Sequence, residues 1–274
     1  MMARAGRIAI GAAATVAGIV MLAPFALQLS TSLMPSGEIA AGRLLPSALH
    51  LGHYRAVFSA QYSFPRYLAN SLVIAGAAAL ITVLLGSAAA YALTRVARRY
   101  ALPVLMIVLV SAMVPQIAAV SPLFLLLRAL GLLNTYPGLI IPYIGVNLPL
   151  AIWVLYGFFR QLPPELEEAA AIDGAGFGDT IRHVYLPLAA PGVFTTAILV
   201  FIFCWNEFLL ALTINTADAM RTVTVGIAMF PGQYEMPWGV IFAASVVVTL
   251  PLVVLVLVLQ RRIVSGLIAG AVKG

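Results

Sequence analysis

The stretch RQLPPELEEAAAIDGAGFGDTIRHVYLPLAAP, residues 160–191, is the longest polar passage of the chain, and it separates two very apolar segments. We call it the coupling segment. Pro163 and Pro164 open it, and glutamates follow at 165, 167 and 168. Proline is tolerated in the first turn of a helix, and the helix dipole favours negative charge there. The pattern therefore predicts a helix that begins near residue 165.

Glycines mark the end of that helix and the start of another. Gly174 and Gly176 follow the expected helix, and Asp179 then predicts an N-cap. A second apolar stripe at helical spacing follows before Pro191 and consists of Ile181, Val184, Tyr185 and Leu188. The segment thus predicts two short helices outside the membrane. From physics alone, an ordinary solvated loop would have a similar composition.

The rest of the chain is too apolar for a soluble domain. Of its residues 63% are hydrophobic and 9% charged, with a mean hydropathy of +1.06. Soluble domains are typically about 25% charged and under half apolar. The net charge of +6 comes from basic residues at the ends of apolar runs, which favours a lipid membrane over a nucleic acid as the partner. The lone cysteine, Cys204, excludes an intrachain disulfide.

Runs of about 20 apolar residues predict an all-α integral membrane protein with one domain and six spanning helices. The first run is longer than the core of a signal peptide, so we expect an uncleaved span. Small residues repeat every four positions in the second, which predicts close helix packing. The expected spans cover residues 8–33, 66–94, 102–121, 138–159, 192–213 and 239–259, followed by a tail, 260–274.

The basic residues predict the orientation. With both termini inside the cell, ten Arg and Lys residues lie on the inner side and five on the outer side, as the positive-inside rule requires. The outer five are Arg43, Arg55, Arg66, Arg128 and Arg221. The coupling segment is then cytoplasmic, in a multi-pass protein of the bacterial plasma membrane.

The coupling segment resembles the cytoplasmic loop of the membrane subunits of bacterial ABC importers. Those loops carry Glu-Ala-Ala, three residues, Gly, nine residues and Ile-x-Leu-Pro, and Val184 replaces the Ile here. The surroundings are most similar to the MalG-like permeases of maltose-type carbohydrate importers. The similarity extends over all six spans, including NTYPGLIIPY and NLPLAIW. The matching residues are Glu168, Ala169, Ala170, Gly174, Leu186 and Pro187.

The resemblance implies a type I ABC importer permease fold without an ATPase site of its own. Its partners would be a second homologous permease, two ATPase subunits and an extracytoplasmic solute-binding protein. This chain would need no cofactor, since ATP and Mg²⁺ would bind the ATPase subunits. The matching residues and Asp173 would couple to those subunits. The tail would also contact them through Gly270, Lys273 and Gly274.

Glu207 is the one carboxylate well inside an apolar run, with Asn206 before it. Charge at membrane depth is costly and often functional. A hydrogen bond to a neighbouring helix and a place in the translocation path both remain open. Trp205 fits an aromatic belt at the membrane surface. Other polar residues inside apolar runs, Asn70, Gln116 and Asn147 among them, predict contacts between helices.

Other chemistry has little support in the sequence. The chain has no G-x-x-x-x-G-K-[ST] motif for phosphate binding. His50 and His53 are expected to be solvated, and we expect no metal site. The sequence does not assign substrate-binding residues. The alternative from another class is a secondary transporter that works alone, which would need a mid-membrane charged relay. A membrane enzyme lacks a recognisable catalytic constellation.

Overall fold

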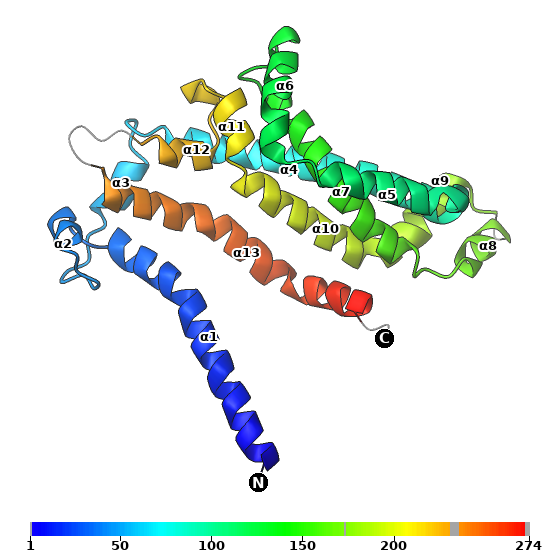
Figure 1. Cartoon of the computed structure of the whole chain (residues 1–274), viewed down its shortest axis with the longest axis horizontal. Helices are drawn as coiled ribbons and strands as arrows, with labels where there is room; N and C mark the ends of the chain where they lie inside the picture. The colour runs from blue at the N-terminus through cyan, green and yellow to red at the C-terminus, as the bar shows by residue number, and fades with distance from the viewer. Residues whose placement is uncertain (1, 173, 231–235, 272–274) are drawn as a thin grey trace. The chain divides into compact units, whose positions relative to one another are not determined.

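The computed structural model describes residues 2–172, 174–230 and 236–271, which form helices with no strand among them (Figure 1). It contains two compact units. The first consists of Met1–Pro65 and Gly226–Pro251, and the second consists of Arg66–Val225 and Leu252–Gly274. Within the described residues, five helices are long and apolar enough to cross a membrane, and a bent pair would make six. The predicted all-α membrane fold is confirmed.

The first unit begins with the long helix α1 (Met2–Ser32), of which Ile10–Ser32 is apolar enough to span. The short helices α2 (Ser36–Ala40) and α3 (Gly52–Val57) follow. Close to α3, the rings of Tyr62 and Phe230 lie 4.6 Å apart and form part of a small aromatic core.

One prediction in this unit is wrong. His53 is not solvated but buried, because its Nε2 lies 2.8 Å from the carbonyl oxygen of Met34, which replaces water as the hydrogen-bonding partner. His50 is exposed, as expected, with its ring 4.8 Å from that of His53.

The second unit is built around three apolar helices. The first, α4 (Phe64–Tyr91), enters it from the other unit and continues into the π-helix η1 (Ala92–Val96). In Figure 1, α7 (Tyr136–Phe159) packs along α10 (Leu186–Asn206). A Cβ atom added to Gly86 would lie 3.0 Å from the Cβ of Ala151, so α4 and α7 approach closely there. The small residues of the second predicted span thus have the expected packing role.

The third predicted span, 102–121, is wrong as a single helix. The chain forms the 3₁₀ turn η2 (Arg98–Tyr100), α5 (Ala101–Ala112) and α6 (Gln116–Ala129), with an 88° bend between the two longer pieces. Pro115 has an extended backbone with ψ of 125° at the start of α6. Proline has no N–H to donate and disfavours the helical conformation of the residue before it, which ends α5.

The last two predicted spans also differ from the helices at their ends. The fifth was expected at 192–213, but α10 ends at Asn206, and α11 (Leu209–Ile214), η4 (Asp218–Met220) and α12 (Val223–Ala228) follow. The sixth, expected at 239–259, lies in α13 (Trp238–Ala271), which continues through most of the tail.

Candidate functional site

The first predicted helix of the coupling segment is present. It is α8 (Glu165–Ile172), and the N–H of Ala175 donates to the carbonyl oxygen of Ala170 at 2.9 Å just beyond its end. Gly174 has a φ of +79°, the left-handed conformation that ends many helices and that glycine adopts without strain. A turn at Gly174 was predicted, and Gly174 lies between α8 and the next helix.

The second predicted helix differs from expectation. It begins as α9 (Phe177–Thr180), so Asp179 lies inside the helix and not at its N-cap. It then continues through the π-helix η3 (Ile181–Tyr185) directly into α10, past Pro191. Wider π turns let a membrane helix accommodate proline, because the freed backbone groups find other partners. The end of the coupling segment and the fifth span are therefore one continuous helical rod.

An arginine and three aromatic rings join the coupling segment to the spans. Tyr185 is fully buried, with its ring centroid 5.3 Å from Tyr91 of α4 and 6.3 Å from Phe159 of α7. The guanidinium of Arg95 lies over the Tyr185 ring, 5.2 Å from its centroid. Arg95 also donates from Nη2 to the carbonyl oxygen of Leu162, at 2.6 Å. These contacts attach the coupling segment to α4, α7 and the start of α10 together.

The sequence did not single out Arg95 or Tyr185 for this role. Arg95 was used only as a charge that ends a span, although Tyr185 belongs to the predicted apolar stripe. A further missed feature is Ile172, which is 86% exposed at the end of α8. An isoleucine within a polar loop was the available signal. The Ile172 side chain is accessible for contact with another protein.

The predicted coupling and tail residues are described only in part. Ala170 is buried, and Pro187 is exposed near the start of α10. Glu168 and Ala169 belong to α8, Leu186 begins α10 and Gly270 belongs to α13. The side chains of Glu168, Ala169 and Leu186 fall outside the description, as do Asp173, Lys273 and Gly274 altogether.

Glu207 lies at the break between α10 and α11 and accepts four hydrogen bonds. Gln116 Nε2 donates at 3.0 Å and the Tyr143 hydroxyl at 2.8 Å. The backbone N–H groups of Leu210 and Ala211 donate to the same carboxylate at 2.9 and 3.1 Å. The side chain therefore caps α11 and links it to α6 and α7, which satisfies donors that have no partner within the helix.

The two residues before Glu207, Trp205 and Asn206, each contact a residue of their own helix. Asn206 is exposed, and its amide donates to the carbonyl oxygen of Ile202 in its own helix, at 2.8 Å. Trp205 is only 1% exposed and stacks on Phe201, with the ring centroids 5.5 Å apart. The expected place of Trp205 in an aromatic belt is therefore wrong, because the ring packs into the helix bundle and not at its surface. Of this triplet, only Glu207 connects separate helices by side-chain hydrogen bonds.

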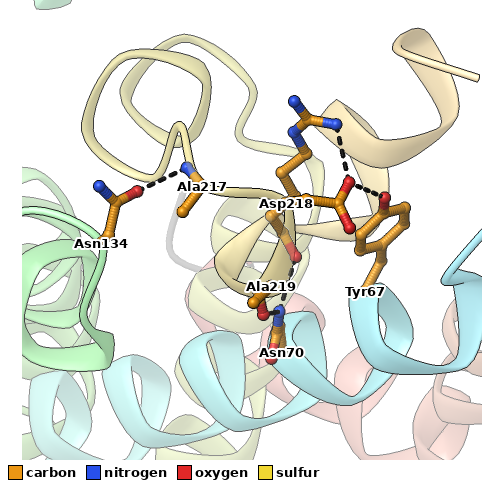
Figure 2. A network of polar contacts seen from close by, with 7 residues as sticks. Tyr67, Asn70, Asn134, Ala217, Asp218 and Ala219 are labelled. Atoms are coloured by element: carbon orange, nitrogen blue, oxygen red, sulfur yellow. Dashed lines mark hydrogen bonds and ion pairs between the residues drawn. The ribbon is translucent and has the colours of Figure 1, made fainter.

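A second polar network holds the loop that contains η4 (Figure 2). Asn70 of α4, which is 2% exposed, donates from Nδ2 to the carbonyl oxygens of Ala219 and Arg221 at 3.0 and 2.9 Å. The Tyr67 hydroxyl donates to Asp218 Oδ1 at 2.5 Å. These contacts fix the loop to the end of α4 and confirm that the polar residue at 70 joins segments that are distant in sequence.

Asn134 holds the other side of the same loop. Its Oδ1 accepts a hydrogen bond from the N–H of Ala217 at 2.7 Å, as Figure 2 shows. Tyr136, at the start of α7, donates to Asn70 Oδ1 at 2.9 Å. The loop is thus attached to two helices whose other ends meet the coupling segment.

Comparisons with known proteins agree with this architecture. Residues 82–268 match the family described as binding-protein-dependent transport system inner membrane component. The chain is 46% identical, over 255 residues, to the trehalose transport system permease protein SugB of Mycobacterium tuberculosis (strain CDC 1551 / Oshkosh), with 92% of this chain and 93% of SugB covered. It is 44% identical to the trehalose/maltose transport system permease protein MalG of Thermococcus litoralis, with 93% of each covered.

Solved structures share the fold. One belongs to a bacterial ABC transporter involved in the import of the acidic polysaccharide alginate, with a TM-score of 0.80, 23% identity, and 94% of this chain and 96% of that chain covered. The family match extends over the coupling segment and the hydrogen-bond network at Glu207. The chain therefore belongs to the binding-protein-dependent transport system inner membrane components, as a multi-pass permease subunit of a bacterial ABC importer.

Proposed function

We propose that the solute imported is a sugar or a sugar-like molecule. The observation that carries this proposal is the near full-length identity of 46% and 44% to permeases named for trehalose and for trehalose and maltose. A third relative, 40% identical, is named for sulfoquinovosyl glycerol in Agrobacterium fabrum (strain C58 / ATCC 33970). These related permeases are named for different sugars, so we infer that other subunits of the importer select the sugar.

The chain forms one half of the translocation path, and a second homologous permease forms the other half. A binding protein outside the membrane delivers the solute, and two ATPase subunits drive the cycle from inside. The family description supports the binding protein, and a structural neighbour is a complex with a periplasmic protein bound to an alginate pentasaccharide. ATP and Mg²⁺ bind the ATPase subunits, since this sequence has no phosphate-binding glycine motif.

The coupling segment docks on an ATPase subunit through α8. The exposed Ile172 at the end of α8 supports this contact, as does the turn at Gly174 that presents it. When ATP closes the ATPase pair, the docked segments move together. The contacts of Arg95 and Tyr185 then pass the movement to α4, α7 and α10. Because a ligand shifts a conformational equilibrium only by binding its two states unequally, ATP and the loaded binding protein must each favour one state.

Reconstitution tests this function and its alternative. The importer is assembled with its partner permease, ATPase and binding protein in proteoliposomes, and uptake of radiolabelled trehalose is measured. We expect uptake to require enclosed ATP and to persist when a protonophore dissipates the proton gradient. Uptake that follows the gradient without ATP would instead establish a secondary transporter. Uptake of a non-sugar solute with no competition from sugars would contradict the proposed substrate class.

A further inference from the structure

Three arginines line a small pocket where two spanning helices end. Arg95 of η1, Arg98 of η2 and Arg160, which follows α7, surround a volume of about 140 Å³ together with Thr94 and Tyr156. We call this the arginine pocket. It brings three positive charges together, and no acidic side chain lines it among the residues whose side chains the structure describes. A concentration of cationic donors of this kind suits an anion with several oxygen atoms.

The arginine pocket lies directly beyond the apolar ends of two candidate spans. The apolar part of the α4 and η1 rod ends at Val96, two positions before Arg98, and that of α7 ends at Phe159, one position before Arg160. Both arginines therefore stand where the hydrocarbon of a bilayer ends. By the charge distribution of the chain this is the cytoplasmic side, where anionic lipids concentrate.

An apolar pocket of about 440 Å³ lies along the same helices. Leu84, Ala88 and Tyr91 of α4 line it, with Phe159 of α7 and Tyr185. Tyr185 connects the two pockets, because its ring also lies under the guanidinium of Arg95. Arg95 itself is held by the carbonyl oxygen of Leu162, so it forms a fixed wall of the arginine pocket. A charged pocket next to an apolar one matches a molecule with a charged head and hydrocarbon chains.

We propose that the arginine pocket binds the phosphate group of an anionic phospholipid, whose acyl chains lie along the apolar pocket. Guanidinium groups bind phosphate oxygens in pairs, and the contact is stronger where water is partly excluded. The pocket prefers an anionic lipid to a zwitterionic one because its three guanidinium groups attract a net negative charge and repel the ammonium group of a zwitterionic headgroup. A bound lipid of this kind would stabilise the junction from which the coupling segment leaves the membrane.

The test measures lipid bound to the purified importer complex by native mass spectrometry, after exchange into mixtures of phosphatidylglycerol and phosphatidylcholine. Arg98→Gln/Arg160→Gln removes two of the three charges without touching Arg95. Arg98→Lys/Arg160→Lys keeps the charge, and Arg66→Gln/Arg128→Gln removes two exposed arginines from elsewhere. We expect the glutamine pair at 98 and 160 to weaken phosphatidylglycerol binding about fivefold for each arginine, or about 25-fold in total. The lysine variant keeps the charge but loses the paired guanidinium contacts, so its binding should fall between that of the wild type and that of the glutamine variant. Arg66→Gln/Arg128→Gln should bind within about twofold of the wild type, because neither residue lines the pocket.

Three results would overturn the proposal. The first is phosphatidylglycerol binding that is unchanged in Arg98→Gln/Arg160→Gln. The second is displacement of the lipid by millimolar inorganic phosphate, which would make the pocket a site for a free anion. The third is a wild-type complex without preference for phosphatidylglycerol, together with loss of the ATPase subunit from the glutamine variant. That result would assign the arginines to an acidic surface of the ATPase.

Discussion

The guanidinium of Arg95 lies 5.2 Å from the centre of the Tyr185 ring, so the end of α4 and the base of α10 are held together by a cation and an aromatic face. Tyr185 is fully buried and Arg95 also holds Leu162, at the entrance of the coupling segment. One arginine thus contacts both the entrance and the exit of this segment. Both ends of the coupling segment are therefore attached to the spans through Arg95.

Replacing the ring of Tyr185 should weaken coupling without preventing insertion. Tyr185→Leu keeps an apolar side chain but removes the aromatic face, and a cation–π contact contributes about 0.5–2 kcal/mol. We expect stimulation of the ATPase by loaded binding protein to fall by about two- to thirtyfold in the reconstituted complex. Tyr185→Phe retains the ring and should retain stimulation. Equal losses in both variants would assign the effect to the hydroxyl and not to the ring.

Gly174 should be sensitive to a side chain for conformational reasons alone. Its φ of +79° is rarely adopted by a β-branched residue, although nothing lies within 4 Å of an added Cβ atom. We expect Gly174→Val to insert normally and to lose ATPase stimulation by the loaded binding protein. The strain amounts to about 1–3 kcal/mol, which shifts the turn and with it the presentation of α8.

Gly178 provides the matched control for that variant. It belongs to the same coupling segment, an added Cβ atom there also meets nothing within 4 Å, and its φ is not positive. Gly178→Val should therefore leave stimulation close to that of the wild type, and Gly174→Asn, which tolerates a left-handed backbone, should restore most of it. Normal stimulation in Gly174→Val would reject the assignment of this turn to coupling.

Glu207 should contribute to stability more than its polar neighbour does. Glu207→Leu leaves Gln116, Tyr143 and two backbone N–H groups without their acceptor, and an unsatisfied buried donor costs about 1–3 kcal/mol. We expect a loss of about 3 kcal/mol or more, visible as a lower melting temperature of the purified complex. The neighbouring Asn206→Ala removes one hydrogen bond within an exposed helix face and should cost under about 0.5 kcal/mol.

Several features of the fold and of the candidate site were predicted correctly from the sequence. Long apolar runs predict spanning helices well, because the bilayer requires about 20 such residues. The small residues of the second predicted span were also correctly assigned to close helix packing. The turn at Gly174 also followed from local chemistry. In each case a short stretch of consecutive residues determines the local structure.

The features that the sequence missed depend on residues far apart in the chain. The break after Asn206 was not predicted, because the capping of α11 by Glu207 is supported by Gln116 and Tyr143, which meet it only in the folded protein. The burial of His53 likewise depends on the carbonyl group of Met34. The bend near Pro115 is different, since the local signal was present and the apolar run on both sides outweighed it.

The polar network that holds the loop containing η4 offers a test in which one substitution has different outcomes at two positions. Asn70 uses its amide N–H₂ group to hold the carbonyl oxygens of Ala219 and Arg221. Asn70→Asp replaces that donor with an oxygen that faces two carbonyl groups, so we expect a loss of about 2–4 kcal/mol in stability. Transport should fall with it, because the loop that contains η4 would separate from α4.

Asn134 is the matched control in the same network. It uses only its Oδ1, which accepts from the N–H of Ala217, and aspartate keeps that acceptor. Its φ of 56° is also one that aspartate tolerates. Asn134→Asp should therefore melt within about 2 °C of the wild type, a shift that corresponds to about 1 kcal/mol or less. Similar losses at both positions would mean that the charge, and not the donor, causes the effect.

The side of the membrane that the coupling segment occupies can be measured directly. In a Cys204→Ala background, Asp179→Cys and Thr216→Cys each place one thiol on an exposed position, the first in α9 and the second beside η4. A membrane-impermeant maleimide added to intact cells should label residue 216 and spare residue 179, which should react only after the membrane is permeabilised. The reason is the excess of arginine around the coupling segment, which favours the cytoplasm. Labelling of residue 179 in intact cells would place α8 outside, where no ATP-driven partner could reach it.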